Sequence, residues 1–183
     1  MPRFIAFLRA INVGGHVVTM ARLREEFDAL GFSDVETFIA SGNVIFNARS
    51  SDAAALEKKI EKRLQAALGY EVATFLRTGA EVAAVARYEA FSQARVKSAR
   101  AFSVGFLASP LSAEATRKLM AFKTDNDDFH TQGREVYWLC KTGQGQSTFT
   151  NAGMERALKI RATFRGINTV ARLAAKHGPP HRP

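Results

Sequence analysis

Cysteine is almost absent from this sequence of 183 residues, since Cys140 is the only one. A single cysteine excludes an intrachain disulfide framework, and its scarcity is typical of proteins of the reducing cytoplasm. Cys140 ends the apolar run VYWLC, where a buried, inert thiol is favoured over a nucleophile. We therefore expect a cytoplasmic protein whose fold is held by its hydrophobic core.

Long hydrophobic runs are also missing. No apolar stretch approaches the roughly 20 residues of a membrane-spanning helix, and the apolar N-terminal stretch is interrupted at Arg9, too early for a signal peptide. With 46% hydrophobic residues and 14 Phe, the chain can bury a core without metals or disulfides. These features predict no membrane partner, and they leave a monomer and a homodimer open.

Acidic residues are scarce in the second half. Of the net charge of +9, residues 1–98 contribute +2 and residues 99–183 contribute +7. No acidic residue follows Glu155, whereas seven basic residues do: Arg156, Lys159, Arg161, Arg165, Arg172, Lys176 and Arg182. Such clustering favours an anionic partner, nucleic acid or a nucleotide, although a solvated helix face is the commoner reason for it.

The residue patterns of common enzyme and metal sites are not recognisable. The histidines lack metal-ligand spacing, and the run TDNDD lacks the glycine and the terminal glutamate of a calcium loop. The RNP1 pattern of an RRM is absent as well, so Phe4 and Phe46 are expected to face the core rather than bases. The sequence thus indicates no metal, no cofactor and no catalytic constellation.

Residues 4–47 carry the clearest structural pattern. A strand at 4–9 is followed by a Gly-Gly turn, a helix capped by Thr19, and a hairpin. The first strand is apolar on both alternating faces, so both sides of it are expected to be covered, one by helices and one by the second half or another subunit. The hairpin strands are expected at 35–40 and 43–47, a second helix from Ser51 or Asp52 to about 68, and a fourth strand at 70–76. This is the βαββαβ order of a ferredoxin-like module.

The second half repeats this order less cleanly. A strand at 101–108 precedes a helix capped by Ser112, and a final helix is expected to be capped by Asn168 and ended by Gly178. The remaining elements are a hairpin (127–132 and 135–140), a helix (151–160) and a short strand (162–165). We predict an α+β protein of two ferredoxin-like (βαββαβ) halves packed together: residues 1–91, a linker at 92–100, residues 101–178, and a tail at 179–183.

Two polar clusters fall in the first half. At the first, a plain strand-to-helix connection is favoured, although free N–H groups before a helix N-terminus can hold an anion. At the second, a structural turn is favoured. The first comprises Arg9, Asn12, Gly14 and Gly15; the second comprises Ser41, Gly42 and Asn43. Taking the first and third strands as parallel, we expect about 17 Å of strand between the clusters, too far for one small ligand.

A third polar cluster is predicted in the second half. The loop GQGQST resembles a phosphate cradle, but it lacks the Lys of a Walker loop and is not a dinucleotide GxGxxG. The cluster comprises Gly143, Gly145 and Ser147, with Arg165, Asn168 and Thr169 downstream.

The segments LRAINVGG, MARLREEFDALGF and TFIASGNVIF, and later GREVYWL and FRGINTVARL, resemble the DUF1697 family. The resemblance implies a bacterial-type α+β protein of duplicated ferredoxin-like halves with no established activity. Thr148 departs from the family pattern, which has Lys there, and Gly166-Ile167 stands where it has Asn-Trp. The polar positions that match are Arg9, Asn12, Gly14, Gly15, Ser41, Gly42, Asn43, Ser147, Thr163, Arg165, Asn168 and Thr169.

Three functional hypotheses follow. The first is a binding module for an anionic partner, acting through the polar loops and the basic C-terminal surface, with Arg161, Arg165 and Arg172 as nucleic-acid contacts. The second is an enzyme of unassigned reaction with a polar site around Arg9, Asn12 and Arg165. The third is a protein-interaction module without a small ligand.

Overall fold

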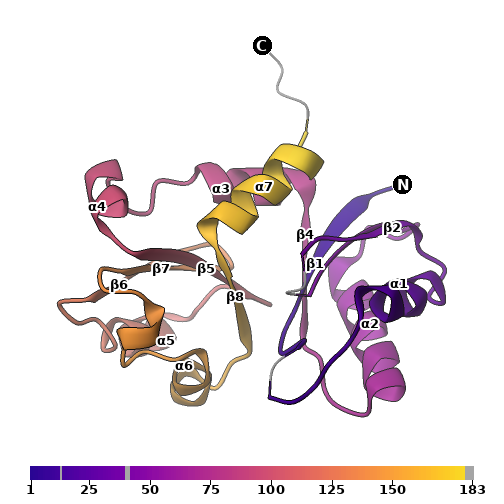
Figure 1. The fold of residues 1–183 in the computed structure, drawn as a ribbon, viewed down its shortest axis with the longest axis horizontal. Coiled ribbons are helices and arrows are strands. Elements are labelled where there is room, and N and C mark those ends of the chain that lie inside the picture. Colours follow the sequence, from indigo (N-terminus) through magenta and orange to yellow (C-terminus); the bar gives the residue numbers. More distant parts are fainter. Residues whose placement is uncertain (13, 40–41, 180–183) are drawn as a thin grey trace. The chain divides into compact units, whose positions relative to one another are not determined.

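The computed structural model describes residues 1–12, 14–39 and 42–179, and the chain forms two compact units (Figure 1). Unit 1 comprises Met1–Ala83 and Leu173–Pro183, and unit 2 comprises Ala84–Arg172. The chain passes between the units within two helices, α3 (Gly79–Arg87) and α7 (Ile167–His177). The predicted boundaries of the two halves, 1–91 and 101–178, stay a prediction.

Unit 1 is an antiparallel sheet with two helices on one face (Figure 1). Apolar residues of both helices, among them Phe27 of α1 and Ile60 of α2, share one core with Phe4 and Phe46 of the sheet, as predicted. The four strands run in the order β2-β3-β1-β4, and the βαββαβ order is confirmed. The elements are β1 (Arg3–Leu8), α1 (Met20–Asp28), β2 (Ser33–Thr37), β3 (Asn43–Asn47), α2 (Ala53–Leu68) and β4 (Thr74–Thr78).

Side-chain caps start the helices of unit 1 where the sequence predicts. The Thr19 hydroxyl accepts from the Arg22 amide at 3.1 Å, and the Asp52 carboxylate accepts from the Ala55 amide at 3.0 Å. Helix α3 begins at the Thr78–Glu81 capping box, in which the Glu81 amide donates to the Thr78 hydroxyl at 3.2 Å.

Strands β1 and β3 run antiparallel, which corrects the expected position of the polar clusters. Phe7 pairs with Asn43 and Arg3 pairs with Asn47, so the end of β1 lies beside the start of β3. The Leu8 amide donates to the Gly42 carbonyl at 2.8 Å. The expected separation of 17 Å is wrong, because the helical crossover makes β2 parallel to β1 and the hairpin then reverses the direction of β3.

Strand β1 is buried on both faces, as its apolar pattern predicts. Phe4 and Leu8 belong to the core under the helices, and Ile5 and Phe7 on the opposite face are fully buried. Its neighbour β4 begins at Thr74 rather than at residue 70, because its ladder with β1 begins at the pair Leu8–Thr74.

Unit 2 repeats the same plan, with strand order β6-β7-β5-β8. Helices α5 and α6 lie on one face of the sheet (Figure 1), where Leu119 and Met154 share a core with Phe129 and Trp138. The elements are β5 (Ala101–Leu107), α5 (Ala113–Met120), β6 (Asp127–Gln132), β7 (Glu135–Cys140), the short 3-10 helix η1 (Gln144–Gln146), α6 (Asn151–Leu158) and β8 (Ala162–Gly166).

Two further segments differ from expectation. The predicted linker contains a short helix, α4 (Gln93–Ser98). Helix α7 begins at Ile167, directly after β8, so Asn168 lies in its first turn and the predicted cap is wrong.

In the part of the chain that the structure describes, no helix is both long and apolar enough to span a membrane.

Candidate anion-binding site

The first predicted cluster lies on an exposed loop between β1 and α1. Asn12, Gly14 and Gly15 are exposed and have left-handed φ angles of 58°, 65° and 87°. The Asn12 carboxamide oxygen accepts from the Val18 amide at 2.6 Å, which closes the loop. Arg9 lies at its base, where its amide donates to the Ala73 carbonyl at 2.8 Å. Among the described residues of this loop, Arg9 is the only one with a permanently charged side chain.

The second cluster meets the first at the same end of the sheet, through the Leu8–Gly42 hydrogen bond. Asn43 is fully buried, and its side-chain amide donates to the Phe38 carbonyl at 3.0 Å. Asn43 therefore holds the turn and is not available to a ligand. Ser41 lies outside the described residues.

The third cluster is divided by the sheet of unit 2. The Ser147 hydroxyl donates to Asp127 at 2.8 Å on the face covered by α5 and α6, where Trp138 also reaches Asp127. Arg165 pairs with Val104 on the opposite face. Asn168 and Thr169 lie beyond the strand, in the first turn of α7. These residues do not form one site.

The three predicted nucleic-acid contacts differ in exposure. Arg161 and Arg172 are exposed, whereas Arg165 is only 8% exposed and donates to the Thr163 hydroxyl at 2.8 Å and to the Phe164 carbonyl at 2.9 Å. Burial lowers the pKa of Arg165 to about 10, so it is charged at neutral pH. Its place in the sheet keeps it from the surface that a polyanion would touch.

The exposed residues of unit 2 carry a larger net positive charge than the unit as a whole, because more of its acidic residues are buried. Of its seven acidic residues, only Glu89, Glu114 and Asp125 are exposed. Twelve of its fourteen basic residues are exposed: Arg87, Arg95, Lys97, Arg100, Arg117, Lys118, Lys123, Lys141, Arg156, Lys159, Arg161 and Arg172. A surface of this kind attracts anions.

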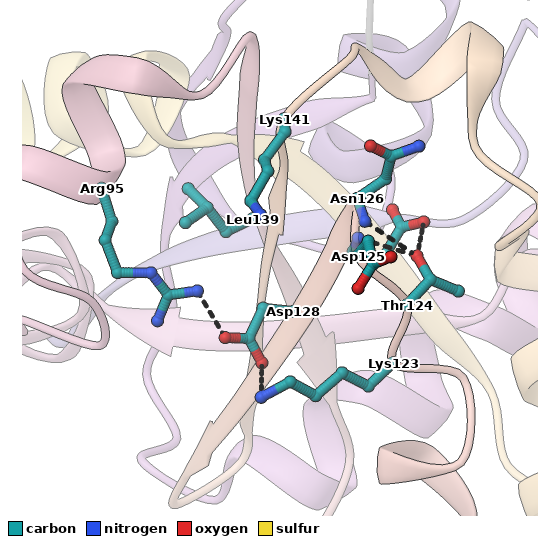
Figure 2. A pocket seen from close by; sticks show the side chains of 9 residues that line it. Arg95, Lys123, Thr124, Asp125, Asn126, Asp128, Leu139 and Lys141 are labelled. Carbon is teal, nitrogen blue, oxygen red and sulfur yellow. Dashed lines mark hydrogen bonds and ion pairs between the residues drawn. The ribbon is translucent and has the colours of Figure 1, made fainter.

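Some of these cations surround a pocket at the edge of the unit 2 sheet (Figure 2). The pocket has a volume of about 290 Å³, close to the lower end of the range for ligand sites, about 300–1,000 Å³. Helix α4, the turn before β6 and the end of β7 form its walls. Its lining residues are Arg95, Lys123, Thr124, Asp125, Asn126, Asp127, Asp128, Leu139 and Lys141.

Asp128 fixes two of the cations in place. Figure 2 shows its carboxylate between Arg95 and Lys123, with N–O distances of 2.5 and 2.9 Å. Burial acts to raise the pKa of Asp128, but hydrogen bonds from Arg95, Lys123 and the Phe129 amide outweigh it and lower that pKa. Asp128 is therefore ionised at neutral pH, and it orients the Arg95 guanidinium while using only part of its donor set.

Asp127 has a structural role beneath the pocket. It is 1% exposed and accepts from the Trp138 indole at 2.8 Å, the Ser147 hydroxyl at 2.8 Å and the Thr124 hydroxyl at 3.1 Å. These bonds fix the turn that carries Lys123.

Three further exposed cations lie on the segments that carry or adjoin the Arg95–Asp128–Lys123 group. Lys141 follows β7 and lines the pocket, and Lys97 lies on α4. The Arg100 amide donates to the carbonyls of Cys140 at 3.1 Å and Lys141 at 3.3 Å, which places Arg100 next to Lys141. We call these five residues the α4 basic cluster: Arg95, Lys97, Arg100, Lys123 and Lys141.

This cluster was not predicted from the sequence, because residues 92–100 were expected to form a linker. The signal was present as three basic residues in SQARVKSAR without an acidic one. Their connection with Lys123 and Lys141 depends on pairing between β6 and β7, which joins Asp128 to Leu139.

Comparison with known proteins bears on the family and the fold. Residues 1–137 match the family described as "Protein of unknown function (DUF1697)". The structure is similar to that of a conserved bacterial protein from Streptococcus pneumoniae, with a TM-score of 0.76 and 22% identity, covering 96% of this chain and 98% of that one. This similarity shows a shared fold. No curated protein matches the sequence.

Proposed function

We propose that this chain, which belongs to the DUF1697 family of proteins of unknown function, binds the phosphate groups of a nucleotide or nucleic acid at the α4 basic cluster of unit 2. The observation that carries the proposal is the exposure pattern of unit 2, in which twelve of fourteen basic residues are exposed but only three of seven acidic ones are. A cytoplasmic location, where such ligands are abundant, is part of the proposal.

The geometry of the pocket suits a phosphate. The Arg95 guanidinium has five N–H donors, and Asp128 holds it in one orientation, so little side-chain freedom is lost when an anion binds. Lys141 supplies a second charge to the same pocket. The nearby exposed carboxylate of Asp125 is outnumbered by these cations.

The extent of the cluster favours a polyanion over a single nucleotide. Lys97 and Arg100 do not line the pocket, yet they extend the positive surface along α4 and the start of β5. About four phosphate contacts would give a slope near −3.6 in a plot of log affinity against log salt concentration for duplex DNA.

Fluorescence anisotropy with labelled single- and double-stranded oligonucleotides at two salt concentrations tests the proposal. The triple variant Lys97→Ala, Arg100→Ala, Lys141→Ala leaves the Arg95–Asp128–Lys123 group intact, and it is expected to weaken binding at least tenfold and to flatten the salt dependence. The matched control removes three exposed cations of unit 1, Arg24→Ala, Lys58→Ala, Lys62→Ala.

Two outcomes would overturn the proposal. One is the absence of oligonucleotide binding by the native protein at low salt. The other is an equal loss in the two triple variants, which would show that only net charge matters. A separate double variant, Arg161→Ala, Arg172→Ala, measures how far the exposed C-terminal cations contribute.

A further inference from the structure

A second pocket lies in unit 1, between the segment that joins α1 to β2, the end of β3 and helix α2. Its volume is about 370 Å³, which is within the usual range for small-molecule sites. It belongs to a different unit from the α4 basic cluster and has a different lining. The lining residues are Leu30, Gly31, Phe32, Ala48, Arg49, Ser50, Leu56 and Lys59.

The floor of this pocket is apolar and well supported. Phe32, Ala48 and Leu56 are 9%, 2% and 5% exposed and belong to the core of unit 1. The Phe32 ring stacks on the Phe46 ring with a centroid separation of 4.3 Å. Such a floor suits a compact apolar group and is held in place before any ligand arrives.

The rim of the pocket is cationic. The Lys59 ammonium donates to the Leu30 carbonyl at 2.8 Å and stands 5.3 Å from the centre of the Phe32 ring, so it is fixed over the floor. Arg49 also lines the pocket and is exposed. No carboxylate is among the lining residues, and within the described ranges neither cation has an ion pair.

The start of α2 argues against a phosphate here. The Ala55 amide already donates to the Asp52 carboxylate, and the Asp52 amide donates to the Ser50 hydroxyl at 3.1 Å. These helix N-terminal donors are therefore occupied, and the negative charge of Asp52 repels a dianion. A single negative charge is better matched to the rim.

We propose that this pocket binds a small monocarboxylate with a compact apolar body. The apolar body would lie against the apolar lining, including the half-buried Leu30 and the edges of Phe32 and Leu56. The carboxylate would accept from the Arg49 guanidinium, which matches its planar geometry, and from the Lys59 ammonium. For a ligand of about ten non-hydrogen atoms in such a site, a Kd of about 1 mM or lower is expected.

Two-dimensional ¹⁵N–¹H NMR titration of the full chain with phenylacetate tests this inference. The amides of Gly31, Phe32 and Ser50 are expected to shift and saturate together, whereas phenylacetamide, which is uncharged, should bind at least tenfold more weakly. Phenyl phosphate compares a dianion of similar shape, and it is expected to bind more weakly than phenylacetate.

Two methionine variants test the contribution of the Lys59 charge separately from that of its apolar stem. Lys59→Met keeps an apolar stem and removes the ammonium, so it should weaken phenylacetate binding about tenfold; Lys62→Met, on the same helix outside the pocket, should not. Thermal unfolding verifies that both variants are folded. The inference is overturned if phenylacetate at 10-fold the expected Kd shifts none of the three amides, if phenylacetamide or phenyl phosphate binds equally well, or if folded Lys59→Met binds like the native protein.

Discussion

Arg77 and Arg165 occupy the same position in the last strands of the two units. Arg77 pairs with Ile5 and Arg165 pairs with Val104. Each arginine comes three residues after the residue that opens its ladder, Thr74 opposite Leu8 in unit 1 and Ala162 opposite Leu107 in unit 2. Both side chains are buried, and each donates from Nη1 to the carbonyl of the residue before it, at 2.8 Å and 2.9 Å. The duplicated sheet thus keeps one buried guanidinium per unit.

Removal of Arg77 should destabilise the protein severely. Arg77 is 1% exposed, and Arg77→Ala leaves a cavity and an unsatisfied carbonyl at Leu76, for an expected loss of about 3 kcal/mol in the free energy of unfolding. Arg24→Ala on exposed α1 should change it by less than about 0.5 kcal/mol. Urea unfolding measures both, and similar values for the two variants would contradict a structural role for Arg77.

The contact between the two polar loops of unit 1 can be tested with two glycines. Gly42 has a φ of 75°, and a Cβ there would lie 3.0 Å from Cβ of Ile11 and 3.2 Å from Cβ of Leu8. Gly14 has a similar φ of 65° but open space around it. Each Ala substitution should lower the free energy of unfolding by about 1–2 kcal/mol, because Ala disfavours a left-handed backbone. Gly42→Ala should lower it by about 1 kcal/mol more because of crowding. Urea unfolding measures both variants, and equal midpoints for the two would show that the loops move apart without a loss of stability.

The ion pairs of Asp128 should contribute a pH-dependent stability. Its folded-state pKa is below the ordinary value of 3.8, so its contribution is complete above that pH and is lost as the pH falls through the lower folded value. Asp128→Asn is expected to lower the free energy of unfolding by about 1–2 kcal/mol at pH 7. The difference from the native protein should shrink below pH 4 in urea unfolding measured from pH 7 to pH 2.

Asp125→Asn is the matched control for that series, since Asp125 is exposed in the same turn. It should change stability by less than about 0.5 kcal/mol at either pH. A pH-independent deficit in Asp128→Asn would mean that packing, rather than charge, explains the effect.

Cys140 should be unreactive in the folded protein. It is fully buried, and burial, together with the neighbouring Asp127 carboxylate, raises the pKa of its thiol. A thiol reagent such as dithionitrobenzoate is expected to leave the native protein unlabelled over minutes at pH 7 and to label one thiol fully in denaturant. Rapid labelling without denaturant would show that the end of β7 opens readily.

Predictions from the sequence were accurate where residues a few positions apart determine the structure, as in helix caps and hairpins. Thr19, Ser51 or Asp52, and Ser112 were predicted to start helices. Thr19, Asp52 and Ser112 each accept a hydrogen bond from the amide three residues later. The hairpin of unit 2 was predicted at 127–132 and 135–140, where β6 and β7 lie. Asn168 was misassigned, because α7 follows β8 directly and begins at Ile167, one residue before it.

The sequence by itself determined the element order, the α+β duplication and the apolar faces, because hydrophobic periodicity and caps depend on residues close together in the chain. Only the tertiary structure decided which polar residues are accessible and which meet. The direction of β3 brought Gly42 to Leu8, the ladder of β8 buried Arg165, and the pairing of β6 with β7 set Asp128 beside Arg95 and Lys123. The first two outcomes rest on strand pairing between residues far apart in the chain, whose direction and register no local pattern encodes. In the third, Arg95 and Asp128 are 33 positions apart, and the predicted hairpin alone does not bring them together.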